Sequence, residues 1–328
     1  MLKKMKFKKP KFWDYKKPNI FSLLLLPFTI PIIVNNFFNK LKKKKISNKE
    51  NPNYHNLRTI CVGNIYVGGT GKTPFAIKVN QILKNLKYRT IFIKKNYVES
   101  YDEYKLLEKY GNVLSHSKRI KSLTEASKTS NVAIFDDGLQ DSSINYDLKF
   151  VCFNIKNFIG NGMLIPSGPL REKISSLKKY DAVLLNGNNE NLDNIIPRIK
   201  KQNKDIKIFE STYVLANLNE LDKKNKYLAF AGIGIPMNFY TMLINNGINI
   251  VKFLPYPDHF KYDYKDIEEI TNIAKNIDAK IITTEKDYSR LKIYNLLHTN
   301  NIQFVKVDLK IKNEDKLINF IKSKIWNQ

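Results

Sequence analysis

The sequence predicts an α/β fold, with a mostly parallel β-sheet that has helices on both faces, a second, smaller α/β domain, and a hydrophobic arm before them. Three observations support this prediction. Apolar runs of strand length alternate with segments of helical periodicity after residue 56. The first of these runs opens into a glycine-rich turn that leads into a helix. Residues 1–50 combine the most apolar segment of the chain with many lysines.

The chain length and one polar stretch suggest how the fold is divided. At 328 residues the chain is long enough for two domains with substantial cores. The polar segment 217–226 separates two series of alternating elements. We therefore expect an arm over residues 1–50, a first α/β domain over 51–216, and a C-terminal α/β domain over 217–328 that completes the functional cleft.

The arm is apolar over residues 20–34. Spanning a bilayer takes about 20 apolar residues, and this run is shorter and is interrupted by Pro27 and Pro31. We expect a segment that lies at a membrane surface, with apolar side chains in the headgroup region and the flanking lysines against anionic lipid. A helix packed on the domain and a transmembrane span are the alternatives. The late start and the lack of a small-residue cleavage site disfavour a signal peptide.

Charge and cysteine content narrow the class of protein. The net charge is +26, but residues 1–50 hold fourteen lysines against two acidic residues, and the remaining excess is spread thinly. We favour a solvated lysine surface over a nucleic-acid groove and expect no nucleic-acid partner. Cys61 and Cys152 lie inside apolar runs, so we expect no disulfide and no cysteine metal site, which fits a reducing compartment.

The glycine-rich turn indicates a phosphate-binding loop. Residues 60–74 read ICVGNIYVGGTGKTP, which predicts a strand over 59–64, a loop, and a helix that includes Pro74. Glycines let successive backbone N–H groups point at phosphate oxygens, Lys72 can reach the β- and γ-phosphates, and the Thr73 hydroxyl can bind Mg²⁺.

The loop departs from the strict motif at one position, because Tyr66 stands where glycine is expected. We therefore read it as a Gly-Gly-Thr-Gly-Lys-Thr variant in a P-loop NTPase-like sheet, against the plainer alternative of a glycine-rich turn with a chance Lys-Thr pair. The predicted ATP-binding residues are Tyr66, Val67, Gly68, Gly69, Thr70, Gly71, Lys72 and Thr73.

Further elements of the first domain follow the same alternation. We expect strands at residues 90–93, 132–135, 150–154, 181–186 and 206–214, and helices at 101–110 and near 122–127. Ligands gather at the carboxyl ends of parallel strands. Asp136 and Asp137 follow one such strand, where an acidic residue would hold Mg²⁺ beside the phosphates, although Asp-Asp-Gly is also a common turn.

A long loop over residues 160–172 is rich in glycine and proline and ends in Arg171 and Glu172. Loops of this length inside compact domains are often functional. Turn chemistry accounts for the glycines but not for the Arg-Glu pair, so both residues are candidates for the site.

The second series of elements predicts a smaller α/β domain. We expect strands at 227–231, 248–254, 280–284 and 302–307, and helices at 238–246, 264–276 and 316–326. The glycines at Gly232 and Gly234 do not form a dinucleotide motif, because the third glycine is missing and Pro236 intervenes.

Seven motifs occur in order along the chain. They are Val62-Gly63-Asn64, residues 67–74, Asp136-Asp137-Gly138-Leu139-Gln140, residues 162–172, residues 231–236, Pro257-Asp258-His259-Phe260 and Thr284-Glu285-Lys286-Asp287. Together they resemble the tetraacyldisaccharide 4′-kinase family of the lipid A pathway, from about Phe12 to beyond Arg290. The resemblance implies a kinase that uses ATP and Mg²⁺ to phosphorylate an acylated glucosamine disaccharide lipid. It also implies attachment, peripheral or monotopic, to the cytoplasmic face of the inner membrane, and we expect no obligate protein partner.

The resemblance implies roles for individual residues. Lys72 and the loop would bind ATP, and Thr73, Asp136 and Asp137 would serve Mg²⁺ and the phosphates. The family's general base is an aspartate in a Gly-Asp-Glu triplet, for which Tyr101-Asp102-Glu103 is the nearest match, so Asp102 is our candidate base and Glu103 the first alternative. His259 matches the histidine that partners this aspartate, and Arg171 and Glu172 match polar residues of the site.

The chain departs from the family pattern at three places. The family's Ser-Arg-Gly-Tyr-Gly after the second strand is replaced by residues 94–98, and the spacing from there to Asp102 is short. The usual histidine after Asp-Asp-Gly-Leu-Gln is Asp141, and the usual proline after Arg-Glu is Lys173.

Two functions of other classes compete with the kinase. A membrane-associated P-loop ATPase switch of the partitioning or targeting kind would hydrolyse ATP without an acceptor and would leave the Pro-Asp-His-Phe motif unexplained. A basic nucleic-acid binder would show salt-sensitive binding, and the sequence contains no recognition motif for it.

Overall fold

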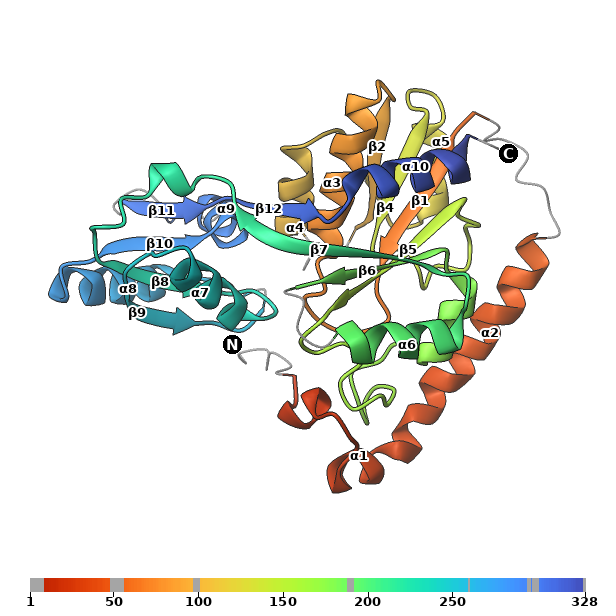
Figure 1. The fold of residues 1–328 in the computed structure, drawn as a ribbon, viewed down its shortest axis with the longest axis horizontal. Helices are drawn as coiled ribbons and strands as arrows, with labels where there is room; N and C mark the ends of the chain where they lie inside the picture. The colour runs from red at the N-terminus through yellow and green to blue at the C-terminus, as the bar shows by residue number, and fades with distance from the viewer. Residues whose placement is uncertain are drawn as a thin grey trace. The chain divides into compact units, whose positions relative to one another are not determined.

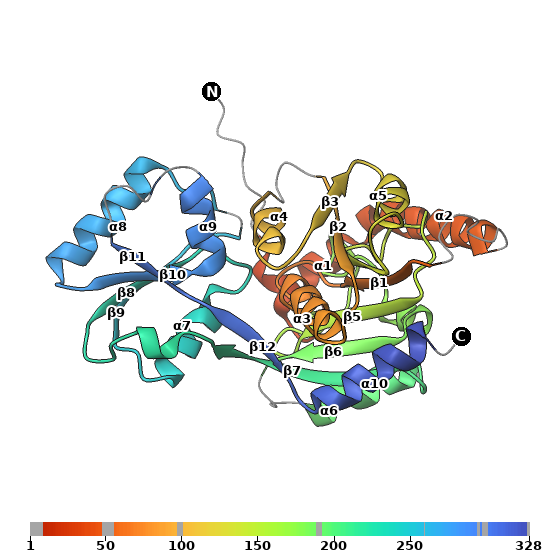
Figure 2. The same cartoon turned by 90° about the horizontal axis from the view of Figure 1, so that it is seen from above.

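A computed structural model describes residues 9–47, 56–96, 101–187, 192–258, 260–293, 296 and 301–326, and Figures 1 and 2 show its ribbon in two views. The chain forms two compact units. The first contains Met1–Lys95, Gly111–Thr212 and Ile311–Gln328, and the second contains Asn96–Tyr110 and Tyr213–Lys310. Each unit is therefore built from separate segments of the sequence. The domain boundaries expected from the sequence, after residues 50 and 216, remain predictions.

The larger sheet has the strand order β12-β7-β6-β5-β1-β4-β2-β3. Neighbouring strands from β7 to β3 pair in parallel. Its strands are β1 (Arg58–Gly63), β2 (Thr90–Lys95), β3 (Val113–His116), β4 (Val132–Asp136), β5 (Leu148–Asn154), β6 (Ala182–Asn186), β7 (Lys207–Leu215) and β12 (Val307–Ile311). The expected mostly parallel sheet is confirmed.

Helices cover both faces of this sheet, as expected. They are α3 (Lys72–Asn85), α5 (Arg119–Ala126), α6 (Leu192–Gln202) and α10 (Glu314–Ile325). The central strands β1, β4 and β6 are almost entirely buried, as a sheet covered on both sides requires. On one face Phe75 of α3 and Phe320 of α10 pack against Phe150 of β5.

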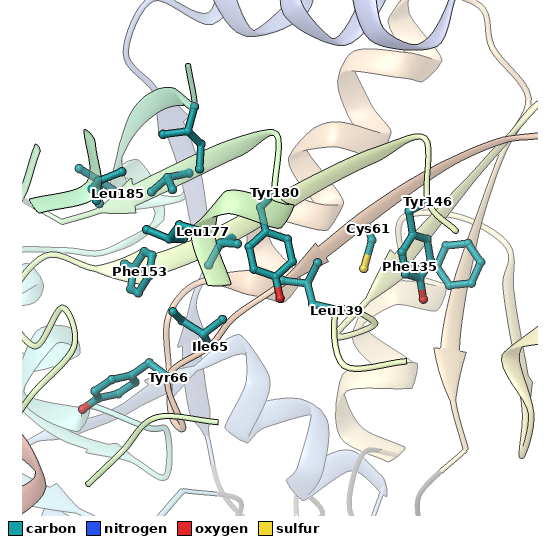
Figure 3. Packing of buried hydrophobic residues seen from close by; sticks show 14 of the residues in the cluster. Cys61, Ile65, Tyr66, Phe135, Leu139, Tyr146, Phe153, Leu177, Tyr180 and Leu185 are labelled. Atoms are coloured by element: carbon teal, nitrogen blue, oxygen red, sulfur yellow. The ribbon is translucent and has the colours of Figure 1, made fainter. Parts of the chain in front are cut away.

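The other face carries a large apolar cluster, part of which is drawn in Figure 3. The cluster contains buried side chains of β1, β4, β5 and β6 on this face, which pack against α5, α6 and the loop after β5. A 3-10 helix at Ile174–Lys179 contributes Leu177. Tyr66, the first residue of the predicted phosphate loop, belongs to this cluster and is 2% exposed. The loop is therefore fixed to the core at its beginning.

The second unit is a smaller α/β layer structure. Its four strands have the order β11-β10-β8-β9 and pair in parallel. They are β8 (Tyr227–Ala231), β9 (Ile250–Pro255), β10 (Lys280–Thr284) and β11 (Ile302–Val305), with helices α4 (Tyr101–Glu108), α7 (Pro236–Asn245), α8 (Tyr264–Asn276) and α9 (Glu285–Ile293) and a 3-10 turn at Leu218–Glu220. Helices α8 and α9 pack on one face and α7 on the other.

The N-terminal arm belongs to the first unit and consists of 3-10 turns at Lys11–Asp14 and Leu26–Thr29 and the helices α1 (Ile20–Leu24) and α2 (Ile30–Ser47). The usual burial of side chains is reversed in this arm, because polar side chains are buried and large apolar ones are exposed. Ser22 and Thr29 are buried, whereas Phe21, Leu24 and Phe28 are each at least 60% exposed. Among the described residues, no helix has both the length and the apolarity to cross a bilayer.

Every strand and helix expected after residue 56 is present, with ends that differ by a few residues, but the strand expected over 302–307 is divided into β11 and β12, which belong to different sheets. Three further elements were not expected. Strand β3 is only half-buried and polar at its end, α6 carries Pro197 inside a charged segment, and α9 begins directly in the Thr-Glu-Lys-Asp motif. The last helix, α10, was grouped with the second domain, yet its Phe320 packs on β5 and β7 of the first unit. A long-range contact of this kind leaves no local pattern in the sequence.

Candidate functional site

The predicted phosphate loop lies between β1 and α3, at the carboxyl edge of the sheet. Gly68 and Gly71 have backbone φ values of +132° and +88°. Residues other than glycine rarely adopt such values. The Asn64 side chain donates to the Thr70 hydroxyl at 3.0 Å and holds the loop closed. Helix α3 begins at Lys72, so the free N–H groups of its first turn and its positive dipole end face the loop. This geometry suits a phosphate group.

Thr73 and Asp136 meet at the start of α3. The Thr73 hydroxyl donates to Oδ2 of Asp136 at 2.9 Å, and Asp136 is 1% exposed at the end of β4. Its other oxygen, Oδ1, is buried and has no hydrogen-bond partner. A buried carboxylate oxygen needs a partner, so the pair fits a hard cation such as Mg²⁺, which uses few protein ligands and completes its shell with phosphate oxygens and water. No group of three or more histidine, cysteine or acidic side chains within the described part of the chain could hold a metal.

The structure adds Lys94 to this site. Its Nζ donates to Oδ2 of Asp136 at 2.6 Å, and the two side chains are 5% and 0% exposed. Strands β2 and β4 are neighbours, with Ile93 opposite Phe135, so their next residues meet at the carboxyl edge. The sequence showed Lys94 only as a departure from a family motif. A lysine at the end of an apolar strand was the available signal.

Asp137 has two cationic neighbours. Its carboxylate is 3.9 Å from Lys72 Nζ and 3.0 Å from Arg171 Nη1. Burial acts to raise the pKa of Asp137, but Lys72, Arg171 and Lys94 outweigh it and hold the pKa below its usual value. Asp137 is therefore an anion that links the end of β4 to the phosphate loop and to the loop after β5.

Glu172 is enclosed by donors rather than open to a ligand. It is 7% exposed and accepts hydrogen bonds from the Tyr180 hydroxyl at 2.9 Å, from Gln140 Nε2 at 3.1 Å and from Lys179 Nζ at 3.1 Å. Gln140 also donates to the backbone oxygen of Asn64 beside the phosphate loop. Glu172 thus ties three segments together, and its position beside Arg171 makes it a support for the site.

The predicted catalytic residues Asp102 and His259 belong to the second unit. Asp102 lies in the first turn of α4, and its side chain is outside what the structure describes, as is residue His259. Their neighbours are described. Lys286 Nζ is 3.4 Å from a carboxylate oxygen of Glu103 and 3.7 Å from one of Asp258. One lysine of α9 thus contacts the residues that follow Asp102 and precede His259.

A buried ion pair organises the same unit. Asp287 is fully buried and accepts hydrogen bonds from Arg290 at 2.7 Å, the Thr284 hydroxyl at 2.7 Å and the Gly232 backbone N–H at 3.0 Å. Tyr262 adds a fourth donor. The network joins two of the predicted motifs, residues 231–236 and 284–287, although no role was predicted for Asp287 itself.

A family model described as tetraacyldisaccharide-1-P 4′-kinase matches residues 21–326. A tetraacyldisaccharide 4′-kinase of Pelagibacter ubique is 52% identical over 317 residues, which cover 96% of this chain and 97% of that protein. A protein of the same name from Rickettsia canadensis is 34% identical over 345 residues, with coverages of 97% and 98%.

A solved structure has a similar fold. The "apo" form of LpxK from Aquifex aeolicus in complex with ATP aligns with a TM-score of 0.68 at 24% identity, and the alignment covers 94% of this chain and 100% of that one.

Proposed function

This chain belongs to the tetraacyldisaccharide-1-P 4′-kinase family, and from that membership we propose that it transfers the γ-phosphate of ATP to the 4′-hydroxyl of a tetraacyl glucosamine disaccharide 1-phosphate in lipid A biosynthesis. One structural observation supports the proposal above all: Lys72, Thr73 and the unpartnered oxygen of Asp136 meet at one phosphate loop. Phosphoryl transfer depends mainly on such positioning and charge neutralisation.

ATP would bind through residues Tyr66 to Thr73, with the loop N–H groups on the phosphates and Lys72 at the β- and γ-phosphates. Thr73 and Asp136 would hold Mg²⁺, with Asp137 close by, and the ion would supply charge neutralisation on the phosphates. Arg171 keeps Asp137 in place through the ion pair at 3.0 Å. These assignments of ATP and metal residues are proposals that the contacts support.

Asp102 is the residue we propose as general base. The sugar oxygen attacks the γ-phosphorus, the bond from that phosphorus to the bridging oxygen of ADP breaks, and the hydroxyl proton passes to Asp102, which His259 would orient. Glu103 is the alternative base, but its carboxylate faces Lys286 at 3.4 Å. This ion pair already gives the Glu103 carboxylate a partner, so Asp102 stays our first candidate.

The arm would hold the enzyme at the membrane surface, where the acyl chains of the substrate lie. Its inverted burial supports this. Buried Ser22 and Thr29 face the protein, and large apolar side chains face outward. The exposed apolar residues of the arm are Ile20, Phe21, Leu23, Leu24, Leu26, Phe28, Ile30, Ile33, Val34, Phe37, Phe38 and Leu41. We propose attachment, peripheral or monotopic, to the cytoplasmic face of the inner membrane, with lysines of the arm against anionic lipid.

A transfer assay tests the reaction. Purified enzyme is given labelled ATP, Mg²⁺ and an acylated disaccharide 1-phosphate in mixed micelles, with wild type compared against Asp102→Ala, Glu103→Ala and His259→Ala. We expect Asp102→Ala to lose at least about a hundredfold in kcat, as loss of a general base does, and Glu103→Ala to keep most of it. ATP hydrolysis that is equally fast with and without the acceptor would contradict the kinase.

Vesicle binding tests the membrane surface. Wild type is expected to sediment with vesicles that contain anionic lipid. A Leu24→Ser/Phe28→Ser variant is expected to stay in the supernatant, because both side chains are exposed. Burial of each in lipid contributes on the order of 1.5–3 kcal/mol. Equal sedimentation of the variant and wild type would contradict membrane binding through the exposed apolar side chains of the arm.

A further inference from the structure

Tyr66 connects the phosphate loop to the N-terminal arm. Its hydroxyl lies 2.5 Å from Oδ1 of Asp14 and 2.6 Å from Nζ of Lys9, and Lys9 also lies 5.0 Å from the centre of the tyrosine ring. The ring itself packs in the cluster of the first unit (Figure 3). The residue that replaces the first glycine of the strict motif is therefore held from two sides, by the core and by the arm.

Trp13 fastens the same arm to the loop that follows β5. It is 1% exposed, and its indole N–H donates to the backbone oxygen of Pro166 at 2.9 Å. Its own backbone oxygen accepts from the N–H of Asn161 at 3.0 Å. Gly160 leaves room for this contact, since a Cβ there would come within 2.1 Å of the Trp13 oxygen.

The loop after β5 returns to the phosphate loop. Tyr66 pairs with Leu170 in an antiparallel bridge, and the N–H of Val67 donates to the oxygen of Pro169 at 2.8 Å. The backbone that enters the phosphate loop is thus bound to a segment that Trp13 holds. Two independent routes, one direct and one through this loop, run from the arm to Tyr66.

A third contact reaches Arg171. Asn36 of α2 donates to the backbone oxygen of Arg171 at 2.9 Å, and the side chain of Arg171 binds Asp137. The same arm that exposes a large apolar face therefore contacts both the entry of the phosphate loop and the backbone of Arg171, whose side chain pairs with Asp137.

We propose that the arm is a structural part of the nucleotide site, with Asp14 and Lys9 acting as positioning residues that set the phosphate loop through the Tyr66 hydroxyl. This inference rests on the proposed ATP site at residues Tyr66 to Thr73. Because binding is reciprocal, ATP in turn strengthens the docking of the arm. The enzyme then binds ATP tightly only when its membrane-facing arm is folded against the first unit.

The test measures ATP affinity by calorimetry with Mg²⁺ and without acceptor, together with KM and kcat in the transfer assay. Tyr66→Phe and Asp14→Ala each remove the hydrogen bond between the Tyr66 hydroxyl and Asp14. Each is expected to raise the Kd and the KM for ATP about fivefold, the size expected from losing one hydrogen bond that orders a binding loop, with kcat within about twofold of wild type. Lys9→Met, which removes the donor to the Tyr66 hydroxyl, is expected to raise the Kd for ATP in the same direction.

Tyr227→Phe is the matched control. Tyr227 is 1% exposed and its hydroxyl donates to the backbone oxygen of Asp222 in the second unit, so the variant loses the same group away from the site and is expected to bind ATP as wild type does. If Tyr66→Phe does not fold, Asp14→Ala decides, because the Asp14 side chain is 39% exposed. A lowered melting temperature with an unchanged Kd in both variants would overturn the inference.

Hydrogen exchange of the wild-type chain provides a second measurement. Addition of ATP and Mg²⁺ is expected to slow amide exchange in residues 10–24 and 160–168, which the nucleotide does not reach in this assignment. Unchanged exchange there, while residues 66–73 become protected, would overturn the inference but leave the ATP site intact. Failure of the wild type to bind ATP would instead overturn the proposed function.

Discussion

Lys94 donates a hydrogen bond of 2.6 Å from its Nζ to Oδ2 of Asp136, where the neighbouring strands β2 and β4 end. The Thr73 hydroxyl donates to the same oxygen at 2.9 Å. Both charged side chains are buried, and a buried charge is tolerated only when it is paired. The chain itself therefore provides a cationic partner for the carboxylate that we propose as a Mg²⁺ ligand.

Removal of Lys94 is expected to destabilise the protein. Lys94→Met keeps the aliphatic stem but leaves the Asp136 carboxylate without its cation, and loss of one partner from a buried pair costs about 3–5 kcal/mol. Urea unfolding in EDTA measures the free energy of unfolding. We expect Mg²⁺ to restore part of the loss in Lys94→Met. Lys312→Met, which breaks the exposed pair with Glu210, is the control and is expected to change stability by less than about 1 kcal/mol. Equal stability of Lys94→Met and wild type would contradict this role.

The lowered pKa of Asp137 is expected to make the free energy of unfolding depend on pH. Because its pKa in the folded chain is lowered, the folded state favours the carboxylate, and this contribution is complete above the ordinary pKa near 4 and is lost as the pH falls through the lower, folded value. Between about pH 5 and pH 2.5, wild type is expected to lose unfolding free energy more steeply than Asp137→Asn. Parallel curves for the two proteins would show that Lys72 and Arg171 do not hold this charge.

Lys286 is expected to act on the catalytic step. It contacts Glu103 on α4 and Asp258, so Lys286→Met frees the segments that carry Asp102 and His259 from each other. We expect kcat to fall roughly tenfold, about the effect of a misplaced catalytic group, with the KM for ATP unchanged.

The control for Lys286 is Lys105→Met on α4, which breaks an exposed pair with Glu108. It is expected to keep kcat within about twofold, since such pairs contribute little. A Lys286→Met enzyme with wild-type kcat would refute the positioning role, whereas a rise in the KM for ATP alone would place Lys286 at the nucleotide instead.

Gly160→Ala is expected to weaken the docking of the arm. The added methyl would meet the Trp13 backbone oxygen at 2.1 Å, and Gly160 has φ +56°, so both the contact and the backbone are strained by about 1–3 kcal/mol each. Trp13 fluorescence in a Trp326→Phe background reports the change, with a red-shifted emission expected. Gly162→Ala, where the methyl would meet only Ile159 at 3.7 Å, isolates the effect of φ. Identical emission in all three proteins would contradict the tight contact.

The sequence was most informative where function depends on local order. The phosphate loop is one continuous segment, so its residues predicted both the loop and the helix after it, and Asp136 followed from a strand that ends in carboxylates. Lys94 could not be found in this way, because its partner is set by the order of the sheet, in which β2 neighbours β4.

The sequence also could not predict which side chains of the arm are buried. Its apolar composition predicted a membrane segment, but which face turns inward depends on distant polar groups. Ser22 is buried because Asn161 donates to its hydroxyl at 2.9 Å, and no periodicity within residues 20–34 encodes that partner. Glu172, expected from the sequence as a polar site residue, is likewise held by Tyr180 and Gln140 through contacts that only the folded loop creates.

Phosphate transfer by Lys72→Ala tests most directly whether this phosphate loop serves a lipid-sugar kinase. Labelled ATP, Mg²⁺ and the acylated disaccharide 1-phosphate are incubated with wild type, with Lys72→Ala and with Lys78→Met, whose pair with Glu314 lies farther along α3. We predict labelled 4′-phosphate from wild type and Lys78→Met, and a rate at least about a hundredfold lower from Lys72→Ala, since one charged group at the transferred phosphate is worth this much. Equal transfer by Lys72→Ala and wild type would contradict the account.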